Sequence, residues 1–193
     1  MTSVPCFPPA QLTVRLCLGL ACACGLSAPA GDWPQYRGPN HDGVSTELIR
    51  TNWDAPPEVV WRRPLDPGLS SFAVQAGRLY TMVNRLDTSD GEQKEWCVAM
   101  DAADGTELWA TPLDQAYYPG GGVGNDDGPR STPSASGTNV YAYTSYLILA
   151  CLNADTGAVV WKHDFRSDPS YTSSSINWQN AAQANLAVDN GVY

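Results

Sequence analysis

Two stretches of the sequence repeat the same order of residue types and decide the fold. They are Trp96-Cys-Val-Ala-Met-Asp-Ala-Ala-Asp-Gly-Thr-Glu-Leu-Trp109 and Ile148-Leu-Ala-Cys-Leu-Asn-Ala-Asp-Thr-Gly-Ala-Val-Val-Trp161. In each, an apolar run leads to Asp or Asn, then to Gly four residues later and to Trp four residues after that. The segment Glu58-Val-Val-Trp61-Arg-Arg-Pro-Leu65 has the form of the end of an earlier copy. The tryptophan spacings are 48 and 52 residues, and a repeat of this length indicates a repetitive architecture.

A second pattern runs through the chain with the same period. Ala73-Val-Gln-Ala-Gly-Arg-Leu-Tyr80 aligns with Ala135-Ser-Gly-Thr-Asn-Val-Tyr141 and again with Ala187-Val-Asp-Asn-Gly-Val-Tyr193. The first tyrosine spacing is 61 residues and the second is 52, and a glycine-rich insertion at 117–129 accounts for the difference. Two independent patterns with one period make a chance repeat improbable.

Each unit is predicted to form four short strands separated by turns. In the second complete unit the strands are expected near 131–136, 139–145, 147–153 and 158–163. Four-stranded units of about 50 residues are typical of propeller blades. The predicted fold is therefore all-β: a partial β-propeller of about two full blades plus flanking strands. A β-sandwich is the alternative, but it does not require a Trp at the same place in every unit.

The first 30 residues are predicted to be a secretory signal peptide. The apolar run 16–26 follows Arg15 and is too short to span a bilayer, and Ala28-Pro-Ala30 has the form of a cleavage site. We therefore expect a secreted or periplasmic protein with no transmembrane span in the mature chain. Cys22 and Cys24 fit a lipoprotein box poorly, so a lipid anchor is not expected.

Removal of the signal leaves two cysteines, Cys97 and Cys151. In the repeat alignment they lie on equivalent faces of neighbouring blades, roughly a sheet spacing apart, so two buried free thiols are expected rather than a disulfide. Residues 31–57 are expected to form a lead-in segment and 58–193 the repeats. Tyr193 aligns with the second strand of a blade, so we expect the chain to be part of a longer propeller.

The docking pattern resembles that of the pyrroloquinoline quinone (PQQ) repeat family of β-propellers, Ala-x-Asp-x-x-Thr-Gly-x-x-x-Trp. The first stretch matches it at Ala99, Asp101, Gly105 and Trp109, with Asp104 in place of Thr. The second matches at Thr156, Gly157 and Trp161, with Cys151 and Asn153 in place of Ala and Asp. The resemblance covers essentially all of 32–193 and implies that these residues join neighbouring blades. The residues with this expected role are Trp61, Trp109, Trp161, Gly105, Gly157, Asp101 and Asn153.

The resemblance implies two classes of function. Some members are quinoprotein alcohol or sugar dehydrogenases that hold PQQ and Ca²⁺ on the propeller axis, and others bind proteins without a cofactor. The mature chain lacks the vicinal cysteines of the alcohol dehydrogenases. We therefore expect a non-catalytic binding or scaffolding module whose loops contact a protein or polysaccharide. The alternative is a fragment of a PQQ- and Ca²⁺-dependent dehydrogenase whose cofactor residues lie outside this chain.

The remaining candidates carry little chemistry. Arg130, at the entry to the first strand of the second blade, is the candidate for an anion contact at the axis, and pairing with Asp126 or Asp127 is the alternative. No catalytic, cofactor-binding or metal-binding residue is predicted, because the loop at 125–128 lacks further ligands and the two histidines are 122 residues apart. A net charge of −9 disfavours nucleic acid as a partner. Three tyrosines in loops could stack on sugars or peptides: Tyr117, Tyr118 and Tyr171.

Overall fold

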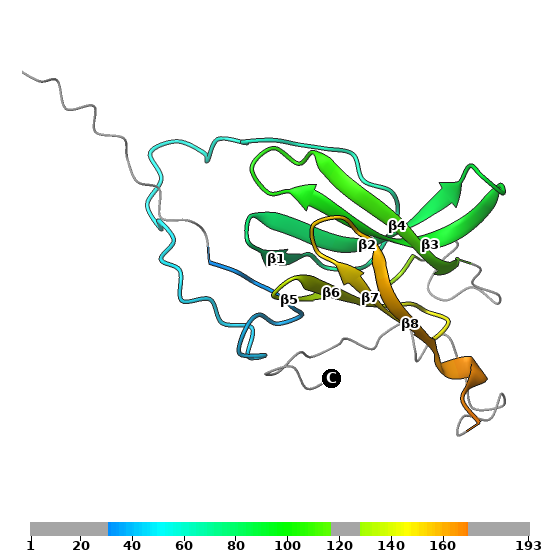
Figure 1. Cartoon of the computed structure of the whole chain (residues 1–193). Helices are drawn as coiled ribbons and strands as arrows, with labels where there is room; N and C mark the ends of the chain where they lie inside the picture. Colours follow the sequence, from blue (N-terminus) through cyan, green and yellow to red (C-terminus); the bar gives the residue numbers. More distant parts are fainter. Residues whose placement is uncertain (1–30, 117–127, 170–193) are drawn as a thin grey trace, which may run out of the picture.

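The computed structural model describes residues 31–116 and 128–169. Their regular structure consists of two four-stranded antiparallel sheets in which the strand order follows the chain (Figure 1). The first sheet contains β1 (Ala73–Gln75), β2 (Arg78–Asp87), β3 (Glu92–Asp101) and β4 (Glu107–Gln115). The second contains β5 (Ser134–Ser136), β6 (Asn139–Tyr143), β7 (Ile148–Asn153) and β8 (Val159–Asp164). A short 3-10 helix, η1 (Phe165–Ser167), follows β8.

Short hairpins produce this meander order. Ala76 and Gly77 connect β1 to β2 with φ of 50° and 75°, and positive φ at both central residues suits a two-residue hairpin whose twist matches the flanking strands. Both sheets also have an irregularity at the same place. The pairing of the third and fourth strands shifts register just after Ala99 in the first sheet and just after Cys151 in the second. The two sheets are therefore copies of one design down to a β-bulge.

The main hydrophobic core lies between the two sheets. It combines residues of one face of the first sheet with residues of the facing side of the second, and the sheets stack one above the other in Figure 1. The contributing residues are Ala73, Tyr80, Met82, Cys97, Ala99, Trp109 and Leu113 from the first sheet and its turns, and Ala135, Val140, Ala142, Ala150, Leu152 and Ala154 from the second. The facing positions of β6 and β7 are mostly small, which lets the bulkier side chains of the first sheet pack closely against them.

The opposite face of the first sheet carries a smaller apolar cluster around Val83, Val98 and Met100. Arg85 lies beside it, with its guanidinium 5.8 Å from the centre of the Trp96 ring. This guanidinium also forms a bidentate pair with a glutamate of β4, at 2.7 and 3.1 Å. The face thus ends in a charged, partly exposed rim.

The lead-in segment joins the innermost strands of both sheets. Trp33 and Val74 exchange two backbone hydrogen bonds of 2.8 Å, and the amide of Ala135 donates to the carbonyl of Pro34 over 2.7 Å. Asp32 accepts a further hydrogen bond from the amide of Ala76 at 3.0 Å. Residues 32–34 therefore pair with β1 and reach β5, and they cover the inner edges of the sheets.

The all-β architecture with two four-stranded blades is confirmed, and only strand limits differ. The first strand of the second blade is shorter than the expected 131–136, because Pro129 and Pro133 have no amide to donate to a ladder. β6 ends at Tyr143, since Thr144 turns the chain and its hydroxyl accepts from the amide of Ile148 at 3.0 Å. The signal peptide, the insertion 117–127 and the third copy at 187–193 lie outside the described residues.

Candidate functional site

One tryptophan of each copy packs on a turn of the next copy. The Trp61 indole nitrogen donates to the carbonyl of Ala102 at 3.0 Å, and the Trp109 indole nitrogen donates to the carbonyl of Ala154 at 3.0 Å. Both acceptors belong to the turn between the third and fourth strands. Trp109 also lies against the Tyr80 ring, with ring centroids 6.0 Å apart. Each indole therefore ties its own strand to the following sheet.

The turns that receive these rings are shaped by their acidic or amide side chain and their glycine. Asp101 accepts a hydrogen bond from the amide of Ala103 at 2.7 Å, and Asn153 accepts from the amides of Asp155 and Thr156 at 3.0 Å. Gly105 and Gly157, at φ of 72° and 70°, close the turns. A β-carbon on either would lie 2.6 Å from the indole ring above it. Only glycine permits both the backbone conformation and the ring contact.

Trp161 is the third tryptophan of the series and differs from the other two. It is 39% exposed, and its ring lies 6.2 Å from that of Tyr141, as Trp109 lies beside Tyr80. Among residues 31–116 and 128–169 it has no turn of a following sheet to pack on. The structure thus places six of the seven expected docking residues in two equivalent contacts, and these contacts are structural.

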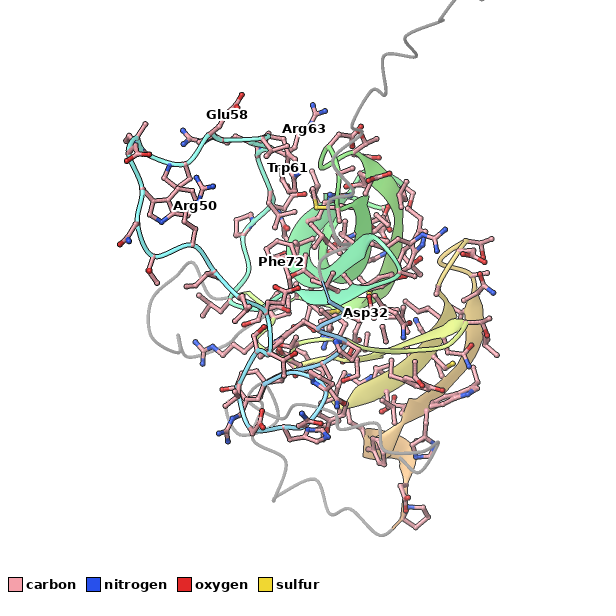
Figure 2. The ribbon with its side chains drawn as sticks, turned by 90° about the vertical axis from the view of Figure 1, so that its left-hand side faces the viewer. Asp32, Arg50, Glu58, Trp61, Arg63 and Phe72 are labelled. Carbon is pink, nitrogen blue, oxygen red and sulfur yellow. The ribbon has the colours of Figure 1, made fainter. Side chains whose placement is uncertain are left out.

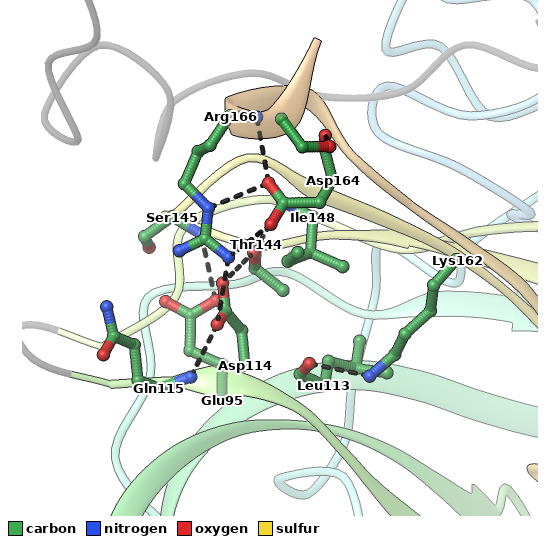
Figure 3. A network of polar contacts seen from close by, with 11 residues as sticks. Glu95, Leu113, Asp114, Gln115, Thr144, Ser145, Ile148, Lys162, Asp164 and Arg166 are labelled. Atoms are coloured by element: carbon green, nitrogen blue, oxygen red, sulfur yellow. Dashed lines mark hydrogen bonds and ion pairs between the residues drawn. The ribbon is translucent and has the colours of Figure 1, made fainter. Parts of the chain in front are cut away.

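The opposite end of the two sheets, here called the hairpin end, contains a polar cluster that the sequence did not indicate (Figure 3). This end holds the β2–β3 hairpin and the β6–β7 turn. Glu95 of β3 is fully buried, and its carboxylate accepts from the amide of Ser145 at 3.0 Å. Asp114 of β4 accepts from the hydroxyl of Thr144 at 3.1 Å. Two carboxylates of the first sheet therefore hold the β6–β7 turn of the second.

Two cations from the second sheet complete this inter-sheet polar cluster. Lys162 of β8 donates to the carbonyl of Leu113 at 2.7 Å. Arg166 pairs with Asp164 at 2.9 Å and lies 3.8 Å from Asp114. Desolvation raises the pKa of Asp114, although the Gln115 amide, Arg166 and Thr144 oppose the shift. Glu95 and Asp114 are also direct partners across β3 and β4, and like charges in such positions repel.

The cluster has the chemistry of recognition and fixation rather than of catalysis. In the described part of the chain, no group of three His, Cys, Asp or Glu side chains is placed to hold a metal ion. Cys97 and Cys151 are both buried free thiols in different sheets, and burial raises the pKa of the Cys97 thiol far above its usual value. The residues present between 31–116 and 128–169 therefore do not fit a calcium-bound quinone capped by adjacent cysteines.

Arg130 lies in the segment that enters β5 and is half-buried between buried neighbours. The carbonyl of Pro129 accepts from the amide of Leu69 at 3.0 Å, and the Thr132 hydroxyl accepts from the amide of Ser71 at 3.3 Å. This entry segment therefore packs beside the corresponding segment of the first sheet. Asp126, Asp127 and the tyrosines at 117, 118 and 171 lie outside the described residues, so the pairing expected for Arg130 stays a prediction, as does its anion contact.

Replacing Asp114 with asparagine is expected to change the pH dependence of stability. A carboxyl whose pKa is higher in the folded state than its ordinary value of 3.8 lowers the free energy of unfolding as the pH rises through that interval. The asparagine amide can still accept from Thr144 but does not titrate. We therefore expect D114N to gain stability relative to the parent between pH 4 and pH 7, measured by urea unfolding at each pH.

Asp87 provides the control of opposite sign. Lys94 and Ser89 lower its pKa to about 2, so its contribution is present above 3.8 and is lost as the pH falls toward 2. D87N should therefore lose stability relative to the parent at neutral pH, with the difference vanishing in acid. A parallel response of the two variants would contradict the assignment of Asp114 as a desolvated carboxyl.

Two four-stranded meanders that stack face to face, each joined to its neighbour by a docked tryptophan, are blades of a β-propeller. The family model described as outer membrane protein assembly factor BamB matches residues 93–192, slightly more than half of the chain. The chain therefore belongs to the PQQ-like repeat family of β-propeller proteins.

Solved structures of this fold are similar to the chain over part of its length. BamB from Moraxella catarrhalis is 17% identical, with a TM-score of 0.37, over 56% of this chain and 28% of that one. A quinohemoprotein alcohol dehydrogenase from Pseudomonas putida HK5 is 20% identical, with a TM-score of 0.39, over 58% of this chain and 15% of that one. The corresponding enzyme from Comamonas testosteroni is 16% identical, with a TM-score of 0.33, over 68% and 27%.

The chain thus spans less than a third of the length of these proteins. No curated protein matches the sequence. The part of the chain that the structure describes has no helix of the length and apolar character needed to cross a membrane.

Proposed function

We propose that the protein is an exported, non-catalytic binding or scaffolding propeller that recognises a protein partner through its hairpin end. The observation that carries this proposal is the locking of the β6–β7 turn by buried carboxylates of the neighbouring blade. Because Glu95 and Asp114 fix Ser145 and Thr144, the loops of two blades present one preorganised surface. Preorganisation reduces the entropy lost when a partner binds.

The β2–β3 hairpin adds a second fixed element to this surface. β2 has ten residues whereas β6 has five, so the first hairpin extends further at this end. Lys94 pairs with Asp87 at 2.8 Å and also with Asp90, which braces the hairpin tip. A projecting, charged hairpin beside a locked turn suits a polar macromolecular surface better than a small ligand, for which an enclosed pocket is typical.

The family match supports a protein rather than a polysaccharide as the partner. The matching model is described as an outer membrane protein assembly factor, and a factor of that kind acts on other proteins. Export is supported by the signal-like pattern at residues 1–30. N-terminal sequencing of protein recovered outside the cytoplasm should begin at Gly31.

Site-specific photo-crosslinking tests which end binds a partner. A benzoylphenylalanine at Thr88, in the β2–β3 hairpin, is compared with the same residue at Thr138, in the turn at the opposite end. Under irradiation in the native host compartment, Thr88 should give discrete protein adducts and Thr138 should not. Equal adducts from both positions, or adducts to carbohydrate alone, would overturn the proposal.

Quinone titration tests the competing dehydrogenase interpretation with the same protein. PQQ and Ca²⁺ are added, free quinone is removed by gel filtration, and quinone absorbance and dye-linked alcohol oxidation are measured. We expect neither signal. Stoichiometric retention of quinone together with alcohol oxidation would show that the propeller is an enzyme.

A further inference from the structure

Residues 58–65 occupy the position of a fourth strand although they are not part of a sheet. Trp61 contacts the first sheet as Trp109, in the fourth strand β4, contacts the second, with the same donor and an acceptor carbonyl at the same place in the turn. The likeness extends two residues further. Arg63 and Thr111 both pack on the turn glycine of the next sheet and donate to a carbonyl of that turn, at 3.2 and 2.7 Å.

The backbone of this segment has an open edge. Residues 58–65 form no backbone hydrogen bond with any described residue, whereas β4 pairs along its length with β3. Val59 is 63% exposed and Val60 is 84% exposed. The segment runs clear of the first sheet before Trp61 and Arg63 reach it, as the labelled side chains in Figure 2 show. An extended segment with unpaired amides and exposed β-branched residues is a template for another strand.

We propose that residues 58–65 are the outer strand of a further blade, and that they pair antiparallel with the third strand of another repeat of the same kind. The two complete sheets specify that strand. Trp109 lies opposite Ala99, and Trp161 lies opposite Cys151, so a small residue must lie opposite Trp61. The small side chain leaves room for the indole to tilt onto the next blade. The partner is therefore an apolar strand with Ala or Cys at that position.

Binding of a hairpin peptide to the intact protein tests this proposal. The probe is the sequence of residues 139–156, with alanine replacing Cys151 to prevent oxidation. A control probe has tryptophan at the same position and would crowd Trp61. Hydrogen exchange with mass spectrometry then reports which amides of the protein become protected. We expect the alanine probe to protect residues 58–65 and the tryptophan probe to leave them exposed.

A matched pair of protein variants separates strand pairing from simple hydrophobic contact. Arg62 is exposed, so R62A leaves the backbone donors intact, whereas R62P removes one amide and clashes with a paired strand. R62P should weaken probe binding at least about tenfold relative to R62A. Equal binding to both variants, protection of β8 instead of 58–65, or no protection at all would each overturn the proposal.

Discussion

Replacing Trp109 with alanine is expected to lower the free energy of unfolding by about 3–5 kcal/mol, the usual range for removing a large buried aromatic side chain. Trp109 is only 9% exposed, covers Gly157 and donates to the carbonyl of Ala154. Its loss removes core contacts of both sheets and one interblade hydrogen bond at once. Urea unfolding followed by far-UV circular dichroism measures the change.

Two further variants show where that free energy comes from. W109F keeps a ring but has no indole donor, so it should cost about 1–2 kcal/mol, the range for a lost hydrogen bond with some loss of packing. Trp53 is 52% exposed and lies 5.6 Å from the guanidinium of Arg50, so W53A should cost less than about 1 kcal/mol. If W109A and W53A destabilised the protein equally, Trp109 would not be a blade-joining residue.

Replacing Gly157 with alanine is expected to cost about 2–4 kcal/mol through two separable effects. Its φ of 70° disfavours any L side chain, by about 1 kcal/mol. The added β-carbon would lie 2.6 Å from the Trp109 ring, so the ring must shift, and overpacking of this kind costs a further 1–3 kcal/mol, roughly. The same urea titration gives the total.

Gly91 isolates the backbone contribution. It has φ of 80°, yet a β-carbon there would meet no atom within 4 Å. G91A should therefore show only the cost of about 1 kcal/mol for the backbone conformation. The difference between G157A and G91A measures the contact with the indole, and a double variant G157A/W109F should be less destabilised than the sum of its parts if the two residues touch. Strict additivity would contradict the contact.

The features that could be predicted from the sequence are those with a short-range signal. The Asp101 and Asn153 turns, their glycines and the Trp four residues later form a local pattern, and a four-residue spacing survives whatever the rest of the chain does. The antiparallel meander followed from the same turns. The strand limits near Pro133 and Thr144 differed, because one residue lacks an amide and the other uses its side chain to close the turn.

The polar cluster could not be predicted, because it depends on how two sheets stack. Glu95 and Ser145 are 50 residues apart, and nothing near either residue indicates the other. Glu95 stands next to Trp96 in a strand that is otherwise buried beyond it, so an acid at that point was the single local sign of a buried partner. The pairing of Trp33 with Val74 likewise has no local signal.

That pairing of the lead-in segment has a consequence for the order in which the protein folds. Residues 32–34 are made early, but their partners come much later: Val74 lies 41 residues after Trp33, and Ala135 lies 101 residues after Pro34. The segment cannot reach its final place until β5 has been synthesised and stacked on β1. Contacts between residues so far apart in the chain form late, since the loop between them must first be closed. The first ordered residues of the chain are therefore among the last to become fixed, and they complete the association of the two blades.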